Sequence, residues 1–190
     1  GPIDVNDTAT SQRPTLRVHE HFTGKKEEFA PLDPQRVTMY VCGMTVQGPP
    51  HMGHMLAFVA ADLIRRTLEY LGYSVLHVQN FTDIDDKIIA RAAETGMTAQ
   101  ELAERNIERF FAASDALNIE RAHVYPRVTE HVDEIVDYIR RLIDTGHAYA
   151  AGGSVWFDVR SYQGYGRLSR RNVDDMISAV RKDLDESKRD

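Results

Sequence analysis

The sequence has little of several features that mark other classes of protein. It has a single cysteine, Cys42, so an internal disulfide and a disulfide-stapled secreted scaffold are both excluded. It has no apolar run long enough to span a membrane and no signal-peptide pattern. It also lacks an excess of positive charge, since its formal net charge is −6. These absences predict a cytoplasmic protein that does not associate with a membrane. They also predict that the chain by itself does not bind nucleic acid tightly.

What is present is the composition of a globular protein with one core. Of the 190 residues, 42% are hydrophobic and 27% are charged, which is typical of folded domains in water. A chain of this length buries one good core, with room for a small appendage. We expect a monomer.

The stretch from Val37 to Gly72 carries the most informative pattern. Its first part, Val37–Val46, predicts a buried strand, and turn residues follow at 48–50. A helix is expected from His51 to Leu71, with Gly72 ending it. Its apolar positions at helical spacing are Met52, Met55, Leu56, Val59, Leu63 and Leu68. The free N–H groups and positive dipole end of this helix would face the space beyond the strand's carboxyl end.

Two histidines stand at the start of this helix. His51 and His54 lie three residues apart and therefore share one face of the first turn. Their imidazoles can donate hydrogen bonds to phosphate oxygens, and Gly53 between them lets a flat base approach the backbone. This arrangement suits the stabilisation of charge on a phosphate while a nucleophile displaces pyrophosphate. The alternative is an ordinary helix start with two surface histidines.

The rest of the chain continues an alternation of strands and helices. Residues 74–78 predict a second strand, and the β-α-β order implies a parallel pair with a right-handed crossover. Further helices are expected from residue 82 onward, over 98–116 and over 128–145, followed by a hairpin over 149–159. The fold class is therefore α/β, with a parallel sheet and flanking helices.

The acidic run after the second strand favours a structural explanation. Thr82 or Asp83 is expected to cap the helix that follows, and Asp85 and Asp86 suit its N-terminal turn. The next helix begins with a capping box at Thr98 and Glu101. The residues expected to face inward in these two helices are Ile84, Ile88, Ile89, Ala92, Ala103, Ile107, Phe110, Phe111 and Leu117.

Cys42 is placed where ligands bind in open α/β sheets, at the carboxyl end of a strand. By itself it cannot make a zinc site, which needs three or four ligands. Taken in isolation, a buried apolar cysteine is the better interpretation.

At this point the chain resembles the cysteinyl-tRNA synthetase family, from about Leu16 to the C-terminus. The His-x-Gly-His pattern alone is common to all class I synthetases and several nucleotidyltransferases. Its combination with the Cys42-Gly43 pair and with T-D-I-D-D-K is far more specific. The segments that carry the resemblance lie at 39–43, 45–46, 51–54, 72–73, 80–87, 115–118, 126–127, 146–149, 165–166 and 168–169.

The resemblance implies an activity and a set of roles. The whole enzyme would join L-cysteine and Mg-ATP into cysteinyl-adenylate and pass cysteine to tRNA(Cys). His51 and His54 would be catalytic, and together with Gly53 they would bind ATP. Cys42, Gly43, Thr45 and Thr82 would contact the amino acid, and Cys42 would be one ligand of a zinc ion that selects the substrate thiolate.

The resemblance also implies a division of the chain. Residues 1–14 are expected to be disordered or a tag remnant, and 15–125 to form the N-terminal half of a Rossmann-like catalytic domain. Residues 126–180 resemble the start of the connective insertion, and 181–190 a frayed charged tail. The family's other zinc ligands (a Cys, a His and a Glu), its K-M-S-K-S loop and its anticodon-binding helices have no counterpart here. We therefore expect these residues alone to be inactive.

Two other functions remain open from the sequence. One is the related ligase that joins cysteine to an amino-sugar in thiol biosynthesis, although T-D-I-D-D-K and the connective-type segment favour the tRNA enzyme. The other is a short, non-catalytic module that binds a nucleotide or a partner.

Overall fold

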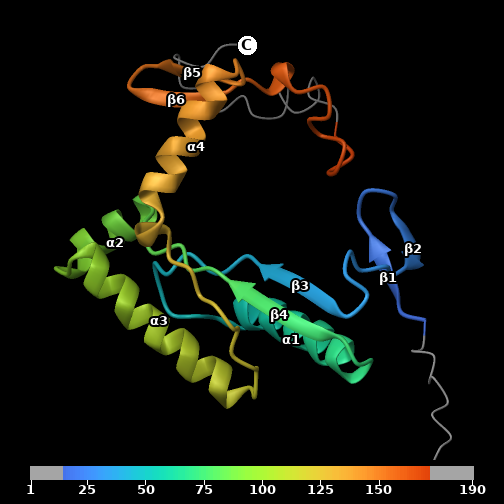
Figure 1. The fold of residues 1–190 in the computed structure, drawn as a ribbon. Coiled ribbons are helices and arrows are strands. Elements are labelled where there is room, and N and C mark those ends of the chain that lie inside the picture. Colours follow the sequence, from blue (N-terminus) through green and yellow to red (C-terminus); the bar gives the residue numbers. More distant parts are fainter. Residues whose placement is uncertain (1–14, 172–190) are drawn as a thin grey trace, which may run out of the picture. The chain divides into compact units, whose positions relative to one another are not determined.

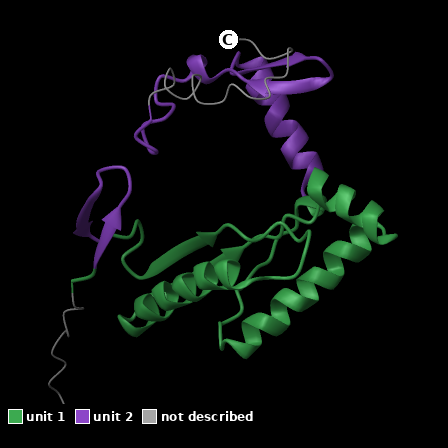
Figure 2. Cartoon of the chain, turned by 180° about the vertical axis from the view of Figure 1, so that it is seen from behind, with its two compact units in different colours: residues 1–16, 29–130 green, residues 17–28, 131–190 purple. Residues whose placement is uncertain are grey.

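The computed structural model describes residues 15–171, which form two compact units (Figures 1 and 2). Of the described residues, unit 1 contains 15–16 and 29–130, and unit 2 contains 17–28 and 131–171. The expectations for residues 1–14 and 181–190 lie outside the described residues. Within 15–171, no helix is long and apolar enough to cross a membrane.

Unit 1 holds a parallel strand pair and its helices. In chain order its elements are β3 (Arg36–Val41), α1 (Met52–Tyr70), β4 (Ser74–Gln79), α2 (Asp86–Thr95), α3 (Ala99–Ala116) and the short 3-10 helix η1 (Val128–Glu130). Strands β3 and β4 pair in parallel, from Arg36 opposite Ser74 to Val41 opposite Gln79, which confirms the predicted β-α-β unit. Parallel bridges from Val78 to Val124 and from Phe81 to Arg127 extend the pairing on the other side of β4.

The core of unit 1 lies between the sheet and the helices on one of its faces. Val37 on β3, Val75 on β4 and Leu68 on α1 form one buried cluster. A second, larger cluster joins the loop after β3 to α1, α2 and α3. Its buried members are Met44, Val46, Met55, Phe58, Phe81, Ile88, Ala92, Leu102, Ala103, Ile107 and Phe110.

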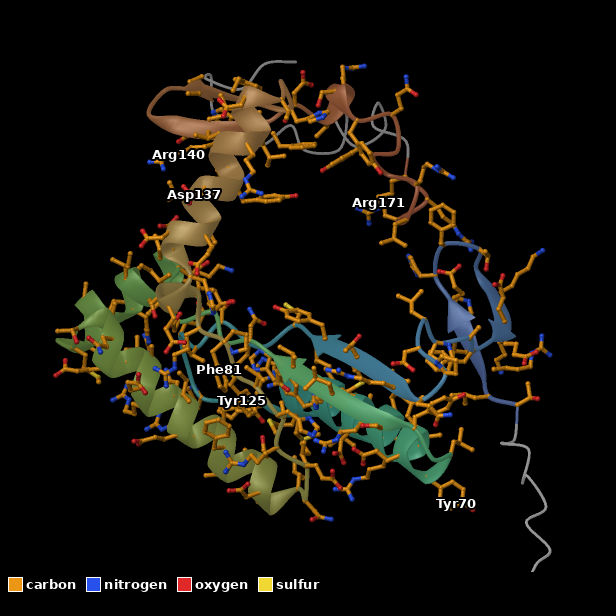
Figure 3. The ribbon with its side chains drawn as sticks, in the orientation of Figure 1. Tyr70, Phe81, Tyr125, Asp137, Arg140 and Arg171 are labelled. Carbon is orange, nitrogen blue, oxygen red and sulfur yellow. The ribbon has the colours of Figure 1, made fainter. Side chains whose placement is uncertain are left out.

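Phe81 lies at the centre of this larger cluster. Its ring meets those of Phe110 and Phe111 edge-on, at 5.3 and 5.5 Å between ring centroids, and stacks on Tyr125 at 5.4 Å. Figure 3 shows Phe81 and Tyr125 beside each other in the interior of unit 1. Because Phe81 directly precedes Thr82, this aromatic cluster fixes the end of β4 on which the candidate site is built.

Helix α1 has two apolar faces, which the sequence pattern does not distinguish. Met55 and Leu68 are buried, but Met52, Leu56 and Val59 are exposed, as is Leu63. Met52, Leu56, Val59 and Leu63 follow one another at intervals of three and four residues, so they form a stripe of their own. That stripe lies opposite the face that packs on the sheet, because the buried positions 55, 58, 61, 65 and 68 form the other stripe.

The predicted N-cap of α3 is confirmed, whereas the predicted N-cap of α2 is wrong. The expected capping box of α3 is confirmed: Thr98 Oγ1 accepts from the Glu101 N–H at 3.1 Å, and Glu101 accepts from the Thr98 N–H at 2.8 Å. The cap of α2 is neither Thr82 nor Asp83 but Asp85, whose Oδ1 accepts from the Lys87 N–H at 2.9 Å.

The inward residues of these two helices are only partly as predicted. Ile88, Ala92, Ala103, Ile107 and Phe110 are buried. Ile84, Ile89 and Leu117 are exposed instead, and Phe111 is only partly buried. Ile84 precedes the first turn of α2 and Leu117 is the C-cap of α3, so the helical periodicity does not apply to these two.

Unit 2 is built from local pairings. Its elements are β1 (Arg17–Glu20), β2 (Lys25–Glu28), α4 (Val132–Asp144), β5 (Ala148–Ala151), β6 (Ser154–Phe157) and the 3-10 helix η2 (Val159–Ser161). Strands β1 and β2 form one antiparallel hairpin, and β5 and β6 form another. The second hairpin and the helix before it confirm the elements predicted over 128–159.

Candidate functional site

The segment that follows β3 breaks the regular ladder with β4. Val41 is paired with Gln79, but the next bridge joins Thr45 to Thr82. From Val41 to Thr45 the first strand advances by four residues, while from Gln79 to Thr82 the second advances by three. One extra residue is therefore inserted between Val41 and Thr45. Such a bulge reverses the faces to which the following side chains point. The single strand predicted over Val37–Val46 is thus wrong: β3 ends at Val41, and its pairing resumes one register later.

Gly43 occupies the bulge in close contact with the chain after β4. Its N–H donates to Oδ1 of Asn80 at 2.7 Å. A Cβ atom at this position would lie 1.6 Å from the Asn80 carbonyl oxygen. Only glycine permits this approach of two backbone segments. Cys42, one residue earlier, is exposed at the bulge, so the interpretation of it as a buried apolar cysteine is wrong.

Thr45 and Thr82 are brought side by side beyond the bulge. The Val46 N–H donates to the Thr82 carbonyl at 3.2 Å, and the Thr82 N–H donates to the Met44 carbonyl at 3.3 Å. The structure therefore gathers Cys42, Gly43, Thr45 and Thr82 at one end of the sheet, as the sequence predicted. This is the edge at which open α/β sheets bind ligands.

Asn106 on α3 forms a hydrogen bond with the same segment. Sequence analysis did not identify this residue. Its side chain is fully buried, and Nδ2 donates to the Val46 carbonyl at 2.9 Å. A signal was present, because Asn106 lies three residues after Ala103 and four before Phe110, on the inward face of an apolar helix. A polar residue at such a position usually bonds a buried backbone group.

The two histidines at the start of α1 cap each other. Nδ1 of His51 accepts from the His54 N–H at 3.3 Å, and Nδ1 of His54 accepts from the His51 N–H at 3.4 Å. Their rings stack, with centroids 3.6 Å apart. Since each Nδ1 is an acceptor, each neutral ring carries its proton on Nε2. The first turn of α1 therefore presents imidazole N–H donors together with the positive end of the helix dipole.

The surroundings of His54 favour the neutral form of its ring. Partial burial lowers the pKa of His54 below its ordinary value, and the neighbouring His51 lowers that pKa further. Gly53 is exposed beside this pair, and a Cβ atom there would meet the His51 ring at 3.1 Å. The predicted residues His51, Gly53 and His54 thus form a second cluster, joined to the first through residues 46–50.

Asp83 has a structural role at a different place from the one predicted. Its carboxylate is buried, and Oδ1 accepts from the Thr129 N–H at 3.0 Å while Oδ2 bonds the Thr129 hydroxyl. Nearby, Arg127 donates to both carboxylate oxygens of Glu104. The bonds of Asp83 attach the segment after α3 to the end of β4, and the Arg127–Glu104 pair attaches the same segment to α3. Asp83 does not cap α2, because α2 begins at Asp86 with Asp85 as its N-cap, and both carboxylate oxygens of Asp83 bond Thr129.

The donor atoms around Cys42 do not make a zinc site. Within residues 15–171, no group of three or more His, Cys, Asp or Glu side chains is placed so that it could hold a metal ion. The Cys42 Sγ lies 3.7 Å from the Gly43 carbonyl oxygen, which is not a metal-ligating pattern. Zinc sites draw on at least three protein ligands, and the described residues do not bring three such groups together around Cys42.

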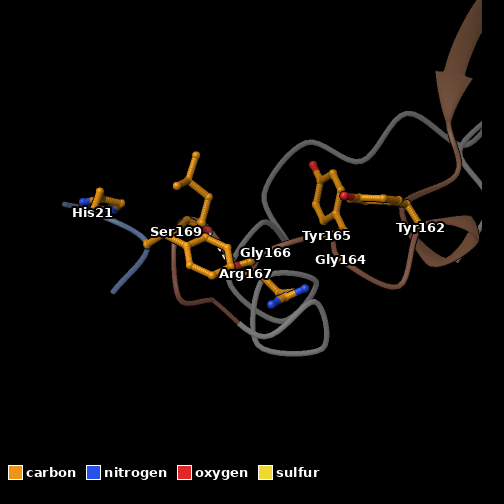
Figure 4. A pocket seen from close by; sticks show the side chains of 9 residues that line it. His21, Tyr162, Gly164, Tyr165, Gly166, Arg167 and Ser169 are labelled. Atoms are coloured by element: carbon orange, nitrogen blue, oxygen red, sulfur yellow. Dashed lines mark hydrogen bonds between the residues drawn. The ribbon is translucent and has the colours of Figure 1, made fainter. Parts of the chain in front are cut away.

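Unit 2 contains a cavity of about 470 Å³ that involves none of the predicted site residues (Figure 4). Aromatic and basic side chains line it, among them Phe22, Tyr162, Tyr165 and Arg167. Phe22 lies under the guanidinium of Arg167, at 5.0 Å from the ring centroid. This hollow is lined by loop residues 162–169 and the turn between β1 and β2, and it is shallow.

Comparison with known families identifies the class of protein. Residues 28–190 match the family described as tRNA synthetases class I (C) catalytic domain, so the chain belongs to that family. The parallel sheet, the helix start with its paired histidines and the residues gathered at the sheet end agree with this class.

Relatives within the family are more specific. The chain is 48% identical over 175 residues to a cysteine–tRNA ligase of Desulforudis audaxviator, and 49% identical over 164 residues to one of Haloarcula marismortui. These alignments cover 92% and 86% of this chain, but only 37% and 33% of the two relatives. The chain therefore spans about a third of the length of the ligases it matches.

Solved structures support the fold. The chain resembles methionyl-tRNA synthetase of Mycobacterium tuberculosis in complex with methionyl-adenylate, with a TM-score of 0.56 and 25% identity. The likeness covers 62% of this chain and 24% of that one. A leucyl-tRNA synthetase from Agrobacterium radiobacter, in a ternary complex, gives a TM-score of 0.54 at 20% identity. Both confirm the Rossmann-like fold.

Proposed function

We propose that this chain is the N-terminal part of the catalytic domain of a cysteine–tRNA ligase. The whole enzyme activates L-cysteine with Mg-ATP to cysteinyl-adenylate and transfers cysteine to tRNA(Cys) in the cytoplasm. The observation that carries this proposal is the 48% identity to a cysteine–tRNA ligase over 92% of the chain. In this scheme residues 15–125 are the first half of the Rossmann-like domain, and 126–180 begin the connective insertion.

The roles of the histidines follow from their hydrogen bonds. With Nδ1 of each ring engaged by a backbone N–H, the Nε2–H groups of His51 and His54 are the donors left for phosphate oxygens of ATP. A neutral imidazole donor and the helix dipole together stabilise the charge that develops as pyrophosphate leaves. Gly53 leaves the first turn of α1 open to the adenine.

Cysteine is proposed to bind at the neighbouring end of the sheet. Cys42, Gly43, Thr45 and Thr82 meet there, with the exposed thiol of Cys42 at the bulge. In the whole enzyme Cys42 would supply one thiolate to a zinc ion that binds the thiolate of the substrate. A soft sulfur-to-metal contact distinguishes cysteine from serine.

The enzyme assay distinguishes this function from its rivals. We expect the full-length protein containing these residues to catalyse cysteine-dependent exchange of pyrophosphate into ATP and to charge tRNA(Cys). Ligation of cysteine to an amino-sugar acceptor, with no charging of tRNA, would instead support the thiol-biosynthesis ligase. Nucleotide binding without either ligation would support a non-catalytic module.

The ATP site is testable on this chain. We expect His54→Ala to weaken any ATP binding about tenfold or more, because it removes a hydrogen bond to a charged group. Calorimetric titration of ATP into both proteins at pH 7.5 measures this, with circular dichroism as a check on helix content.

The matched control is His131→Ala. His131 also stands at a helix start, as the N-cap of α4, but its side chain makes no capping hydrogen bond. The control should bind ATP like the wild type. Equal affinity of the wild type and His54→Ala would remove the histidine from the nucleotide site.

The zinc site gives opposite expectations for this chain and for the whole enzyme. We expect these 190 residues to purify essentially metal-free. Cys42 is the only zinc ligand proposed among the described residues, and a zinc site needs about three. We expect the full-length protein to hold about one zinc per monomer, through Cys42 and later residues.

Plasma mass spectrometry of both proteins measures the metal, and a chromogenic disulfide measures whether the Cys42 thiol is free. The thiol should react in the short chain and be protected in the full-length protein. Stoichiometric zinc in the short chain that survives dialysis, and that Cys42→Ser abolishes, would contradict the prediction.

A further inference from the structure

The bulge after β3 carries the thiol and the threonine of the proposed cysteine site, and its shape is not set by the β ladder. We propose that Asn80 and Asn106 are positioning residues that clamp this bulge, one at each end of the segment 42–46. Asn80 lies in a segment that carries the family resemblance, but that resemblance assigns a role to neither residue. The proposal rests on the proposed function for its catalytic consequence, but the clamp itself is a structural claim.

A ladder without the bulge would place different residues in the site. Continuing the pairing of Val41 with Gln79 would put Thr45 opposite Asp83, whereas the structure puts Thr45 opposite Thr82. A shift of one residue moves every following side chain to the other face of the sheet. In the observed register Met44 and Val46 are buried, and Thr45 points to the opposite face. The bulge therefore decides whether Thr45 and Thr82 can serve one substrate.

Asn80 acts at the first end as a hydrogen-bond acceptor. The bulge takes the Gly43 N–H out of the β ladder, so it does not donate to a carbonyl of β4. It donates instead to Oδ1 of Asn80, at 2.7 Å. Because Asn80 follows the last residue of β4, its side chain reaches across to the strand that contains the extra residue. This bond compensates the backbone donor that the bulge would otherwise leave unpaired.

Asn106 acts at the second end as a hydrogen-bond donor. It is fully buried, and Nδ2 bonds the carbonyl of Val46 at 2.9 Å. A buried polar side chain usually has a hydrogen-bond partner, and the partner of this amide is the backbone of the bulge segment.

Direct detection of the two hydrogen bonds tests the clamp on the native chain. We expect through-hydrogen-bond scalar couplings, measured by long-range HNCO experiments on isotope-labelled protein, between the Gly43 amide nitrogen and Asn80 Cγ. A second coupling is expected between Asn106 Nδ2 and the Val46 carbonyl carbon. A well-resolved spectrum in which neither coupling is present would overturn the proposal, and this measurement requires no variant to fold.

Variants test the acceptor role of Asn80. We expect the Gly43 amide to exchange with solvent about tenfold or more faster in Asn80→Ala, since its hydrogen bond is lost. Asn80→Asp keeps an acceptor oxygen and should restore protection. The Val75 amide, in the β3–β4 pairing, should be unchanged in both. The matched control is Asn118→Asp, at an exposed asparagine, which should leave Gly43 protected. Unchanged protection of Gly43 in Asn80→Ala would contradict the clamp.

The catalytic consequence is measured separately. In the full-length enzyme we expect Asn80→Ala to raise KM for cysteine about tenfold and to leave KM for ATP within about twofold, because the bulge carries the cysteine site and not the histidines. Equal effects on both constants would indicate general loss of structure and contradict the positioning role. If the wild-type enzyme does not activate cysteine at all, the proposed function fails, while the couplings and exchange rates still decide the clamp.

Discussion

Replacing Phe81 by alanine is expected to lower the free energy of unfolding by about 3–5 kcal/mol. The side chain is 1% exposed and contacts the rings of Phe110, Phe111 and Tyr125. Its removal deletes a buried aromatic group and leaves a cavity that a helix, a strand end and a loop would have to fill together. Because Phe81 precedes Thr82, the loss should loosen the end of β4 on which the proposed cysteine site stands.

Urea unfolding followed by circular dichroism at 222 nm measures this change. The matched control is Tyr70→Ala, an aromatic residue at the end of α1 that is 88% exposed (Figure 3). Surface substitutions of this kind usually change stability by less than about 0.5 kcal/mol. A loss for Phe81→Ala no larger than that of the control would mean that the aromatic cluster does not hold unit 1 together.

The parts of this fold that sequence reasoning predicted are those set by local chemistry. The parallel β3–α1–β4 unit follows from a strand pattern, a helix of suitable length and a second strand pattern. The start of α3 follows from Thr98 and Glu101, which bond each other within one turn. In both cases the residues that determine the structure are neighbours in sequence, so the pattern contains the cause.

The parts that were missed depend on contacts between distant segments. The bulge at Gly43 depends on Asn80, which lies after the next strand, and on Asn106 in a helix further on. The sequence pattern predicts Thr82 or Asp83 as the cap of α2, but the buried carboxylate of Asp83 binds Thr129. A carboxylate beside a helix start has the same sequence signature whether it caps that helix or anchors a distant loop.

Helix α1 shows a different limit. Apolar residues occur on two of its faces, so periodicity alone does not indicate which face meets the sheet. The structure selects the stripe with Met55 and Leu68 and leaves the one with Met52 and Leu56 exposed. The predicted site residues fall at two loop ends whose places follow from the parallel topology, and the roles of these residues stay predictions.

Replacing Gly43 by alanine is expected to be the most damaging change of a single small residue within the site. The new Cβ atom would lie 1.6 Å from the carbonyl oxygen of Asn80 and 2.7 Å from its carbonyl carbon. Both obstacles are backbone atoms, so no side chain can rotate away, and either the bulge or the end of β4 must move. We expect a loss of about 1–3 kcal/mol in the free energy of unfolding, as for overpacked sites.

The control for this change lies in the same loop. Gly48 has nothing within 4 Å of an added Cβ atom, so Gly48→Ala should be close to neutral, or stabilising by up to about 1 kcal/mol through the entropy of the unfolded chain. Urea unfolding of both variants gives the difference in stability. Because movement at Gly43 also moves Cys42, the rate at which a chromogenic disulfide modifies the thiol should change in Gly43→Ala and not in Gly48→Ala. If the two variants have equal stability and equal thiol reactivity, the close approach of Gly43 to Asn80 is not what shapes the proposed cysteine site.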